Sequence, residues 1–359
     1  MRIGFAPEFQ RKKIFILGST GFVGSALTKV LIQIGFNNLH CLYRNEFKKK
    51  QIFHELDTSC VSFLKGDIFD ETTIRNGIKN ADIVINTVGI TSDWGSHAKF
   101  EQLNFEAVKK LATIIRDSDT RPHLIHLSAA MIYGFGKGYK SENYPLVASD
   151  PFFTASKVAC HRWLRAEMQA GLPFPVTILA PAMVWGPGDQ RIIPALIGLM
   201  EQKLMFYWGK SRAIDWVHID DLVDAILLCF FNRNSYNQEF IINGPKPFPF
   251  RKYVRKVAEY AEMKVPTPGI PIFILMFLAL IAESAARYMN RKNPEFRPFI
   301  TRFRVTSFTR PLNLSIEKAS HVLGYSPQMV FEYAIDSIKD YIQNEDLWRL
   351  NFQMDEGFR

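Results

Sequence analysis

The sequence predicts an α/β protein with a doubly wound, Rossmann-like parallel sheet and a smaller, mainly C-terminal α+β lobe. Two observations support this class. In the first half of the 359-residue chain, short apolar runs alternate with segments of helical periodicity, the pattern of parallel strands covered by helices on both faces. A glycine-rich turn, "GSTGFVG", joins the first run to the first helical segment, as in a dinucleotide-binding βα unit.

The expected strands are apolar runs, and the expected helices carry apolar residues three and four positions apart. We expect strands within 13–18, 39–44, 61–67, 81–89, 123–129, 175–186 and 238–243, and helices within 21–35, 251–263 and 331–343. A dinucleotide-binding domain is predicted to span 1–186, with segments around 214–245 returning to it. Residues 187–359 are predicted to form the smaller lobe, which serves a substrate or a partner.

The net charge of +9 is unevenly distributed. An apolar stretch, Ile270–Ala282, is followed by a basic segment, 285–310, whose only acid is Glu295. Thirteen helical residues reach about 20 Å, short of the roughly 30 Å hydrocarbon core, so we predict an apolar segment near 266–290 that contacts a membrane surface and not nucleic acid. The alternatives are a core helix and, for the charges, a solvated face. The basic residues are Arg287, Arg291, Lys292, Arg297, Arg302, Arg304 and Arg310.

The four cysteines form no CxxC pair, and the first residues lack the apolar region of a secretory signal. Reduced thiols in an intracellular compartment are therefore expected. Together with the apolar segment, this predicts a peripheral membrane-associated protein. The membrane would be the endoplasmic reticulum or the mitochondrial inner membrane in a eukaryote, or the cytoplasmic face of the membrane in a bacterium.

Gly18, Gly21 and Gly24 stand where the first strand meets the first helix. A dinucleotide site needs a tight turn there, a close backbone approach to the pyrophosphate, and a helix N-terminus whose free N–H groups face an anion. The strand before this turn and the helix after it supply the context that a glycine triad requires. The spacing is GxxGxxG instead of GxGxxG.

This spacing resembles the extended short-chain dehydrogenase/reductase family, and further motifs follow in the family's order over most of the chain. The ending "LSIEKASHVLGYSP" is similar to the 3β-hydroxysteroid dehydrogenase and sterol-decarboxylase branch, which often carries an apolar, membrane-contacting segment. The resemblance implies a nicotinamide dinucleotide cofactor and no metal site. The other matching motifs are "GDI" with Asp67, "IYG" after the fifth strand, "SK" at Ser156 and Lys157, "GPGD" at 186–189 and "WVHIDDLVDAILL" at 216–228.

The glycine turn and the resemblance together give a set of expected cofactor contacts. Asp67 matches the position at which the family contacts adenine, and Lys157 matches the lysine that holds the ribose. The full set is Gly18, Thr20, Gly21, Phe22, Val23, Gly24, Arg44, Asp67, Ile68, Thr87, Val88, Gly89, Lys157 and Pro181.

The second strand ends at Arg44, where an NAD-specific site usually has an acid that binds the ribose 2′-hydroxyl. An arginine here pairs with the 2′-phosphate of NADP, and Lys48 adds to it. Glu46 is close enough to serve as the acid instead. NADP(H) is therefore favoured, and NAD(H) stays open.

In the family, a tyrosine transfers the proton, a lysine lowers its pKa, and a serine or threonine fixes the substrate oxygen. Lys157 is retained, but Phe153 holds the tyrosine position and Ala129 the serine position. Ser128 lies one residue earlier and would restore the serine if the alignment shifted by one. Four residues are possible substitute acids by their proximity in sequence, and His218 is expected to be structural. The substitutes are Tyr133, Tyr139, Tyr144 and His161.

Two functions follow from these residues. In the first, the chain is an NADP(H)-dependent oxidoreductase acting on the hydroxyl or ketone of a small lipophilic molecule, sterol- or isoprenoid-like, with an impaired or altered proton relay. In the second, it binds NADP(H) without turnover, as a structural or redox-sensing subunit of a membrane-associated protein complex. That role would be similar in kind to the dehydrogenase-like accessory subunit of respiratory complex I.

Overall fold

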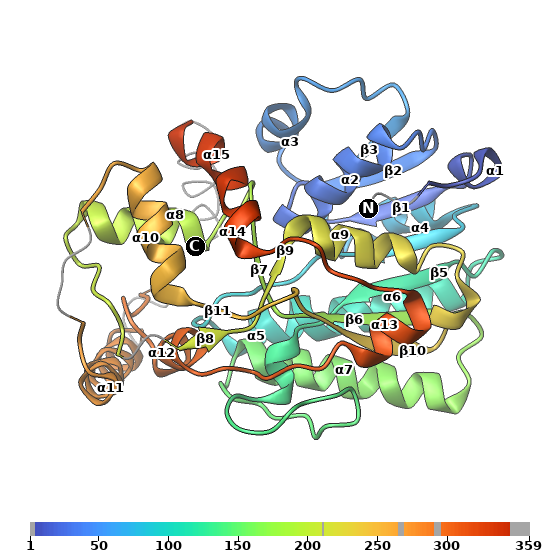
Figure 1. The fold of residues 1–359 in the computed structure, drawn as a ribbon. Coiled ribbons are helices and arrows are strands. Elements are labelled where there is room, and N and C mark those ends of the chain that lie inside the picture. The colour runs from blue at the N-terminus through green and yellow to red at the C-terminus, as the bar shows by residue number, and fades with distance from the viewer. Residues whose placement is uncertain (1–3, 210–211, 265–268, 291–295, 345–359) are drawn as a thin grey trace.

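The computed structural model describes residues 4–209, 212–264, 269–290 and 296–344. Within them, one sheet contains seven parallel strands in the order β10-β6-β5-β4-β1-β2-β3. Helices cover both faces of this sheet (Figure 1), so the predicted fold class is confirmed. The strands are β1 Ile14–Leu17, β2 Leu39–Tyr43, β3 Val61–Lys65, β4 Ile83–Asn86, β5 His123–Leu127, β6 Val176–Pro181 and β10 Gln238–Ile242.

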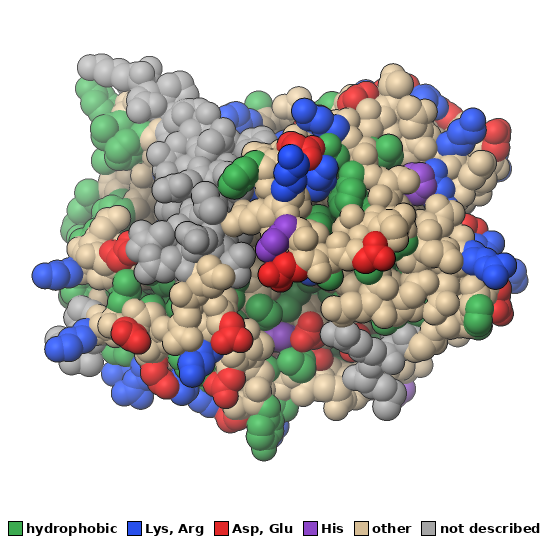
Figure 2. Space-filling view, turned by 90° about the horizontal axis from the view of Figure 1, so that it is seen from above, with side chains coloured by type: hydrophobic (Ala, Val, Ile, Leu, Met, Phe, Trp, Pro, Cys, Tyr) green, Lys and Arg blue, Asp and Glu red, His purple; other side chains and the backbone are tan. Residues whose placement is uncertain are grey.

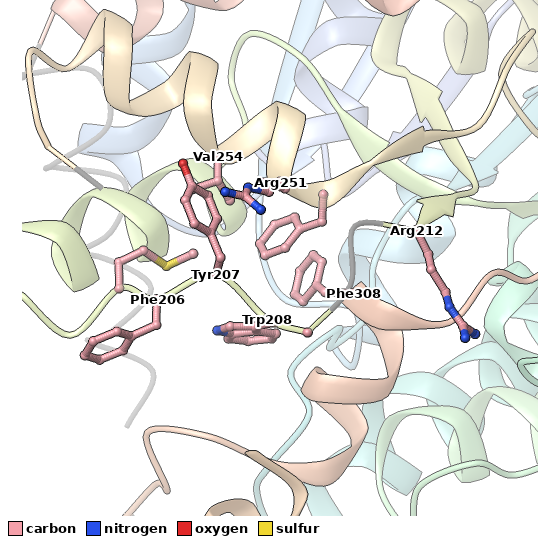
Figure 3. Close-up of a pocket in the computed structure, with 10 residues that line it drawn as sticks. Phe206, Tyr207, Trp208, Arg212, Arg251, Val254 and Phe308 are labelled. Carbon is pink, nitrogen blue, oxygen red and sulfur yellow. The ribbon is translucent and has the colours of Figure 1, made fainter. Parts of the chain in front are cut away.

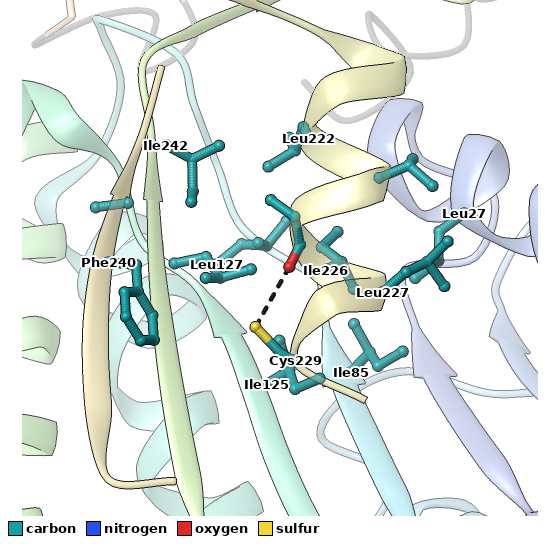
Figure 4. Packing of buried hydrophobic residues seen from close by; sticks show 14 of the residues in the cluster. Leu27, Ile85, Ile125, Leu127, Leu222, Ile226, Leu227, Cys229, Phe240 and Ile242 are labelled. Carbon is teal, nitrogen blue, oxygen red and sulfur yellow. Dashed lines mark hydrogen bonds between the residues drawn. The ribbon is translucent and has the colours of Figure 1, made fainter. Parts of the chain in front are cut away.

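The strands β1, β4, β5 and β6 are buried along their whole length and mainly apolar, because helices cover both faces of the sheet. Figure 4 shows Leu222 and Ile226 pointing toward the strands and Leu227 pointing toward Leu27 of the neighbouring helix. One face is covered by α2 Phe22–Gln33, α9 Ile219–Leu228 and α13 Glu317–Leu323, and the other by α4 Glu71–Ile78, α6 Ala107–Arg116 and α7 Phe153–Ala170.

Within the segment 214–245, α9 packs against α2 and β10 pairs with β6 of the large sheet. The second lobe has its own apolar core, apart from the two cores that flank the sheet. It is built from α8 Ile192–Glu201, α10 Phe250–Tyr260, α14 Phe331–Ala334 and α15 Lys339–Gln343, with β7 Met183–Trp185, β8 Ala213–Ile214, β9 Trp216–His218 and β11 Phe248–Pro249. The remaining elements are α1 Pro7–Gln10, α3 Glu46–Phe53, α5 His97–Glu101, α11 Ile272–Met289, α12 Arg302–Thr309, a π-helical turn Gln102–Glu106 and 3₁₀ turns Ala130–Tyr133, Arg233–Ser235 and Ile335–Ile338.

Two expected elements are divided in the structure. The run 175–186 is not one strand: β6 ends at Pro181, and β7 pairs with β9 outside the large sheet. The run 331–343 is not one helix, because the 3₁₀ turn separates α14 from α15. The spacing of Ile335 and Ile338 suits three residues per turn, and both side chains are buried in the core of the second lobe.

The apolar segment forms a longer helix than the sequence predicted. α11 has 18 residues, which correspond to about 27 Å, and continues to Met289. By length and composition alone, it is the one helix in the described part of the chain that could cross a membrane, and 22% of it is buried. Leu275 and Ala279 face inward and form a small core with Ile300 and Val305.

His123 gives the folded state a predictable acid sensitivity. Burial lowers its pKa to about 3, and its Nε2 lies 2.8 Å from the Thr177 hydroxyl. The folded protein therefore keeps this ring neutral at pH 5, while the unfolded chain protonates it below about pH 6.5. Stability is thus lost as the pH falls, and we expect this group to remove about 2 kcal/mol from the free energy of unfolding between pH 7 and pH 5.

Urea unfolding of wild type and His123→Gln at both pH values measures this contribution. The loss on acidification should be smaller in the variant. If the free energy of unfolding falls equally in the two proteins, His123 is not the source of this pH dependence.

Candidate cofactor and active site

The glycine-rich turn after β1 has no room for side chains at two of its positions. Gly18 has φ of +82°, and a Cβ added there would lie 2.6 Å from Thr87 Oγ1. A Cβ on Gly24 would lie 2.2 Å from the Gly18 carbonyl oxygen. The backbone of the turn therefore passes close to the end of β4, and Gly21 is the N-cap residue of α2. This cradle fits a pyrophosphate held by main-chain N–H groups.

Lys157 extends from α7 to the carboxyl ends of β4 and β5. Its side chain is buried, and Nζ donates a hydrogen bond to the Leu127 carbonyl at 2.9 Å. Burial lowers the pKa of this ammonium group. A Cβ on Gly89, in the loop after β4, would lie 3.2 Å from the same Nζ, so the structure brings the lysine and this loop together.

Asn104 supports this junction and was not singled out by the sequence. Its amide oxygen accepts from Ile90 N at 2.8 Å, while Nδ2 donates to the Ile90 carbonyl at 3.0 Å and to the Ser156 hydroxyl at 2.9 Å. The residue lies in the π-helical turn, a feature often found at functional sites. A π turn adds one residue to an ordinary helical pattern, so hydrophobic periodicity does not reveal it.

At the opposite end of the cofactor site, Arg44 and Asp67 lie side by side after β2 and β3. The guanidinium Nη1 is 3.2 Å from the Asp67 carboxylate. Glu46 is occupied elsewhere: it accepts from the Tyr43 hydroxyl at 2.6 Å and pairs with Lys49 Nζ at 2.6 Å. Lys49 and Tyr43 hold the pKa of Glu46 below its usual value.

The two positions at which the resemblance places a catalytic tyrosine and serine lie together. Ala129 and Phe153 are buried in one small apolar cluster with Phe100, and Phe303 of α12 packs against it. The rings of Phe153 and Phe303 have centroids 6.4 Å apart. The position at which the resemblance places a tyrosine is therefore surrounded by hydrocarbon, and no sequence pattern indicated that α12 would cover it.

Two salt bridges between α12 and largely buried acids hold the helix in this position. Arg304 Nη2 donates to Asp93 at 2.6 Å, and Arg302 Nη2 lies 2.8 Å from Glu283 of α11. Burial raises the pKa of Asp93, but the Arg304 guanidinium and the Thr301 hydroxyl more than offset this, so its pKa lies below the usual value. The helix that carries Phe303 is thus tied both to the loop after β4 and to α11.

Ser128 lies in a polar environment, unlike its neighbour Ala129. Its hydroxyl lies 2.9 Å from His161 Nδ1, and His161 Nε2 lies 2.5 Å from Glu239 of β10. Arg165 adds a salt bridge to Glu239 at 2.8 Å. Of the two positions that the sequence left open for the serine, Ala129 shares the apolar cluster with Phe153, whereas the Ser128 hydroxyl contacts His161.

The tyrosines considered as substitute proton donors lie in different surroundings, outside the cluster of Ala129 and Phe153. Tyr133 is buried with its ring against that of His161, and burial raises the pKa of its hydroxyl. Tyr139 is 84% exposed, and Tyr144 packs its ring against the Lys140 ammonium. His218 caps α9 through Nδ1, and its Nε2 lies 3.2 Å from the Ser337 hydroxyl, which are structural contacts.

The glycine cradle, the buried lysine beside it and the parallel sheet define a dinucleotide-binding protein of the short-chain dehydrogenase/reductase type. The model of the NAD dependent epimerase/dehydratase family matches residues 14–243, and the chain belongs to this family. The sequence-based resemblance is thereby confirmed: the chain is an extended short-chain dehydrogenase/reductase of the 3β-hydroxysteroid dehydrogenase-like branch.

Relatives of similar length cover nearly the whole chain. The 2-alkyl-3-oxoalkanoate reductase of Stenotrophomonas maltophilia is 23% identical over 91% of this chain and 98% of its own. The decarboxylating sterol-4-alpha-carboxylate 3-dehydrogenase of Candida albicans is 23% identical over 94% and 99%. Among solved structures, UDP-glucuronic acid 4-epimerase from Bacillus cereus, in complex with UDP-glucuronic acid and NAD, superposes with a TM-score of 0.72 at 18% identity, covering 92% of this chain and 99% of its own.

Proposed function

We propose that the chain is an NADP(H)-binding protein of oxidoreductase type, directed at the hydroxyl or ketone of a lipophilic molecule, in which proton transfer is impaired. The observation that carries this proposal is the apolar cluster of Ala129, Phe153 and Phe303 beside an intact cofactor cradle. Bound NADPH supplies a hydride. The phenyl ring of Phe153 offers no proton to the substrate oxygen, and Ala129 offers no hydrogen bond.

Contacts at the end of β2 support NADP(H) over NAD(H). The Glu46 carboxylate is engaged by Tyr43 and Lys49, whereas the Arg44 side chain remains 47% exposed beside Asp67. A guanidinium in this place suits the 2′-phosphate, since it binds phosphate through two N–H groups.

We expect Arg44→Ala to weaken NADPH binding about tenfold or more while changing NADH binding little, because a hydrogen-bonded charge pair contributes about 1.5–3 kcal/mol. Calorimetric titration of both proteins with both cofactors measures this. Lys50→Ala, a lysine of α3 that lies beyond the end of β2, serves as the control for loss of one positive charge. Equal affinity of the wild type for NADPH and NADH would contradict the assignment.

The aromatic lining of a small pocket in the second lobe is compatible with a lipophilic substrate. Figure 3 shows a pocket there with Tyr207, Trp208 and Phe308 around it, while Arg212 points away from these rings. The Arg251 guanidinium lies 4.1 Å from the centroid of the Tyr207 ring. Phe308 belongs to α12, as does Phe303, so one helix contributes to both the pocket and the apolar cluster. Two relatives are, by their names, a 2-alkyl-3-oxoalkanoate reductase and a sterol-carboxylate dehydrogenase, which also favours lipophilic substrates.

The alternative function is a non-catalytic NADP(H)-binding subunit of a membrane-associated complex. α11 favours it, because Phe273, Phe277 and Ile281 are 74%, 61% and 51% exposed. Hydrophobic side chains also gather at the left edge of Figure 2, on the side of the second lobe. Arg287 and Arg310 add positive charge to the same region of the sequence, which suits an anionic bilayer. An intracellular protein bound peripherally to a membrane is consistent with both functions.

Two measurements on the wild type separate these functions. NADPH fluorescence titration tests whether the cofactor binds, and loss of NADPH absorbance with medium-chain 3-oxoalkanoates and 3-ketosterols tests for turnover. Saturable binding with slow but measurable oxidation supports the impaired oxidoreductase. Saturable binding without any oxidation favours the non-catalytic subunit, and absence of binding contradicts both.

A further inference from the structure

The two lobes are bridged above the cofactor cradle by Gln190. This residue follows the "GPGD" loop at 186–189 and is 9% exposed. Its Oε1 accepts a hydrogen bond from Lys48 Nζ at 2.7 Å, and its Nε2 lies 3.5 Å from the Thr20 carbonyl of the glycine-rich turn. One amide thus contacts α3 and the turn, although these segments are 142 and 170 residues away in sequence.

The loop that presents Gln190 is firmly anchored in the second lobe. Asp189 accepts from the N–H groups of Arg191 at 2.8 Å and Ile192 at 3.0 Å at the start of α8. The Tyr341 hydroxyl donates to the Asp189 carbonyl at 2.9 Å. Gln190 therefore extends from a fixed base and not from a free loop.

The same loop lies over the N-terminus of α2. A Cβ on Gly188, whose φ is +88°, would come within 3.7 Å of the Phe22 ring. A dinucleotide places its pyrophosphate at this helix N-terminus, and its adenosine half extends toward the end of β2. The bridge between Gln190 and Lys48 thus passes over the adenosine side of the cradle.

We infer that Gln190 is a cofactor-retention residue, which joins the second lobe to Lys48 and slows the release of the bound dinucleotide. This rests on the proposed NADP(H) site and adds a residue to it. Opening the cradle requires the amide–ammonium hydrogen bond to break while the rest of the loop stays anchored. Because such a contact acts after binding, its loss should appear in the dissociation rate more than in the association rate.

Stopped-flow displacement of bound NADPH by excess NADP⁺, followed by NADPH fluorescence, tests this inference. Gln190→Leu keeps the side-chain volume and removes the hydrogen bond, so we expect dissociation about tenfold faster than in the wild type. Gln202→Leu, at the exposed far end of α8, is the matched control and should leave the rate unchanged.

Lys48→Met removes the same hydrogen bond from α3, which keeps the test valid if Gln190→Leu folds poorly. With NADH, which lacks the 2′-phosphate, Gln190→Leu and Lys48→Met should accelerate release equally. The variant that combines these two changes should release NADH no faster than either single variant. Saturable binding with unchanged release from Gln190→Leu and Lys48→Met overturns the bridge alone. Absence of saturable binding of either dinucleotide to the wild type overturns the cofactor site and this inference with it.

Discussion

Exchanging Phe153 for Tyr and Ala129 for Ser is expected to raise NADPH-dependent ketone reduction by about 10²–10⁴-fold over the wild type, the usual contribution of general acid–base catalysis. The phenol would supply the missing proton, and the serine hydroxyl would orient the substrate oxygen. Lys157 is already buried beside the cofactor loop, and its positive charge would lower the pKa of the new phenol. Initial rates with 3-oxoalkanoate and 3-ketosterol substrates measure the gain.

Phe152→Tyr makes the same chemical change one residue away and should leave the rate at the wild-type level. A second control, Lys157→Met in the double variant, should remove the gain. Because the Phe303 ring packs against Phe153, the double variant should also be measured with Phe303→Ala, which opens the cluster. If the wild type itself reduces these ketones rapidly, the interpretation of Phe153 is wrong, and Tyr144 and His161 become the first residues to replace.

Replacing Phe273, Phe277 and Ile281 with serine is expected to lower partitioning onto anionic liposomes by about 10²-fold or more. Each large apolar side chain contributes about 1.5–3 kcal/mol when it is fully removed from water, and an interfacial helix realises part of this. Cosedimentation with phosphatidylserine-containing vesicles measures the partitioning. Salt should weaken binding of the wild type without abolishing it, because screening acts on the charges and not on apolar burial.

Leu275→Ser is the matched control, since this leucine lies in the same helix but only 3% of it is exposed. It should lower the melting temperature and leave vesicle binding nearly intact. Arg287→Gln should reduce only the salt-sensitive part of binding. If the wild type does not cosediment at low salt, α11 does not contact a bilayer, and its exposed face requires another explanation.

The large sheet and the cofactor cradle were predictable from the sequence because they depend on local patterns. Buried parallel strands require apolar runs such as that at 13–18, and a turn closed by Gly18 and Gly24 requires residues without a Cβ. The absence of a tyrosine at position 153 was equally visible, because the lysine four residues later defines the position.

Contacts between distant segments could not be predicted in the same way. Phe303 packs against Phe153 although the two are 150 residues apart, and Gln190 contacts Lys48 across 142 residues. The Ser128 hydroxyl contacts His161, which in turn contacts Glu239. No local periodicity encodes such pairs, since they depend on how α12, the "GPGD" loop and β10 pack against the cradle. The sequence by itself therefore determined the fold class, the glycine-rich turn and the presence of phenylalanine instead of tyrosine at position 153. Only the tertiary structure decided what surrounds Phe153, where the Ser128 hydroxyl makes its hydrogen bond and which side chains of the two lobes contact each other, because side-chain packing between distant segments sets these contacts.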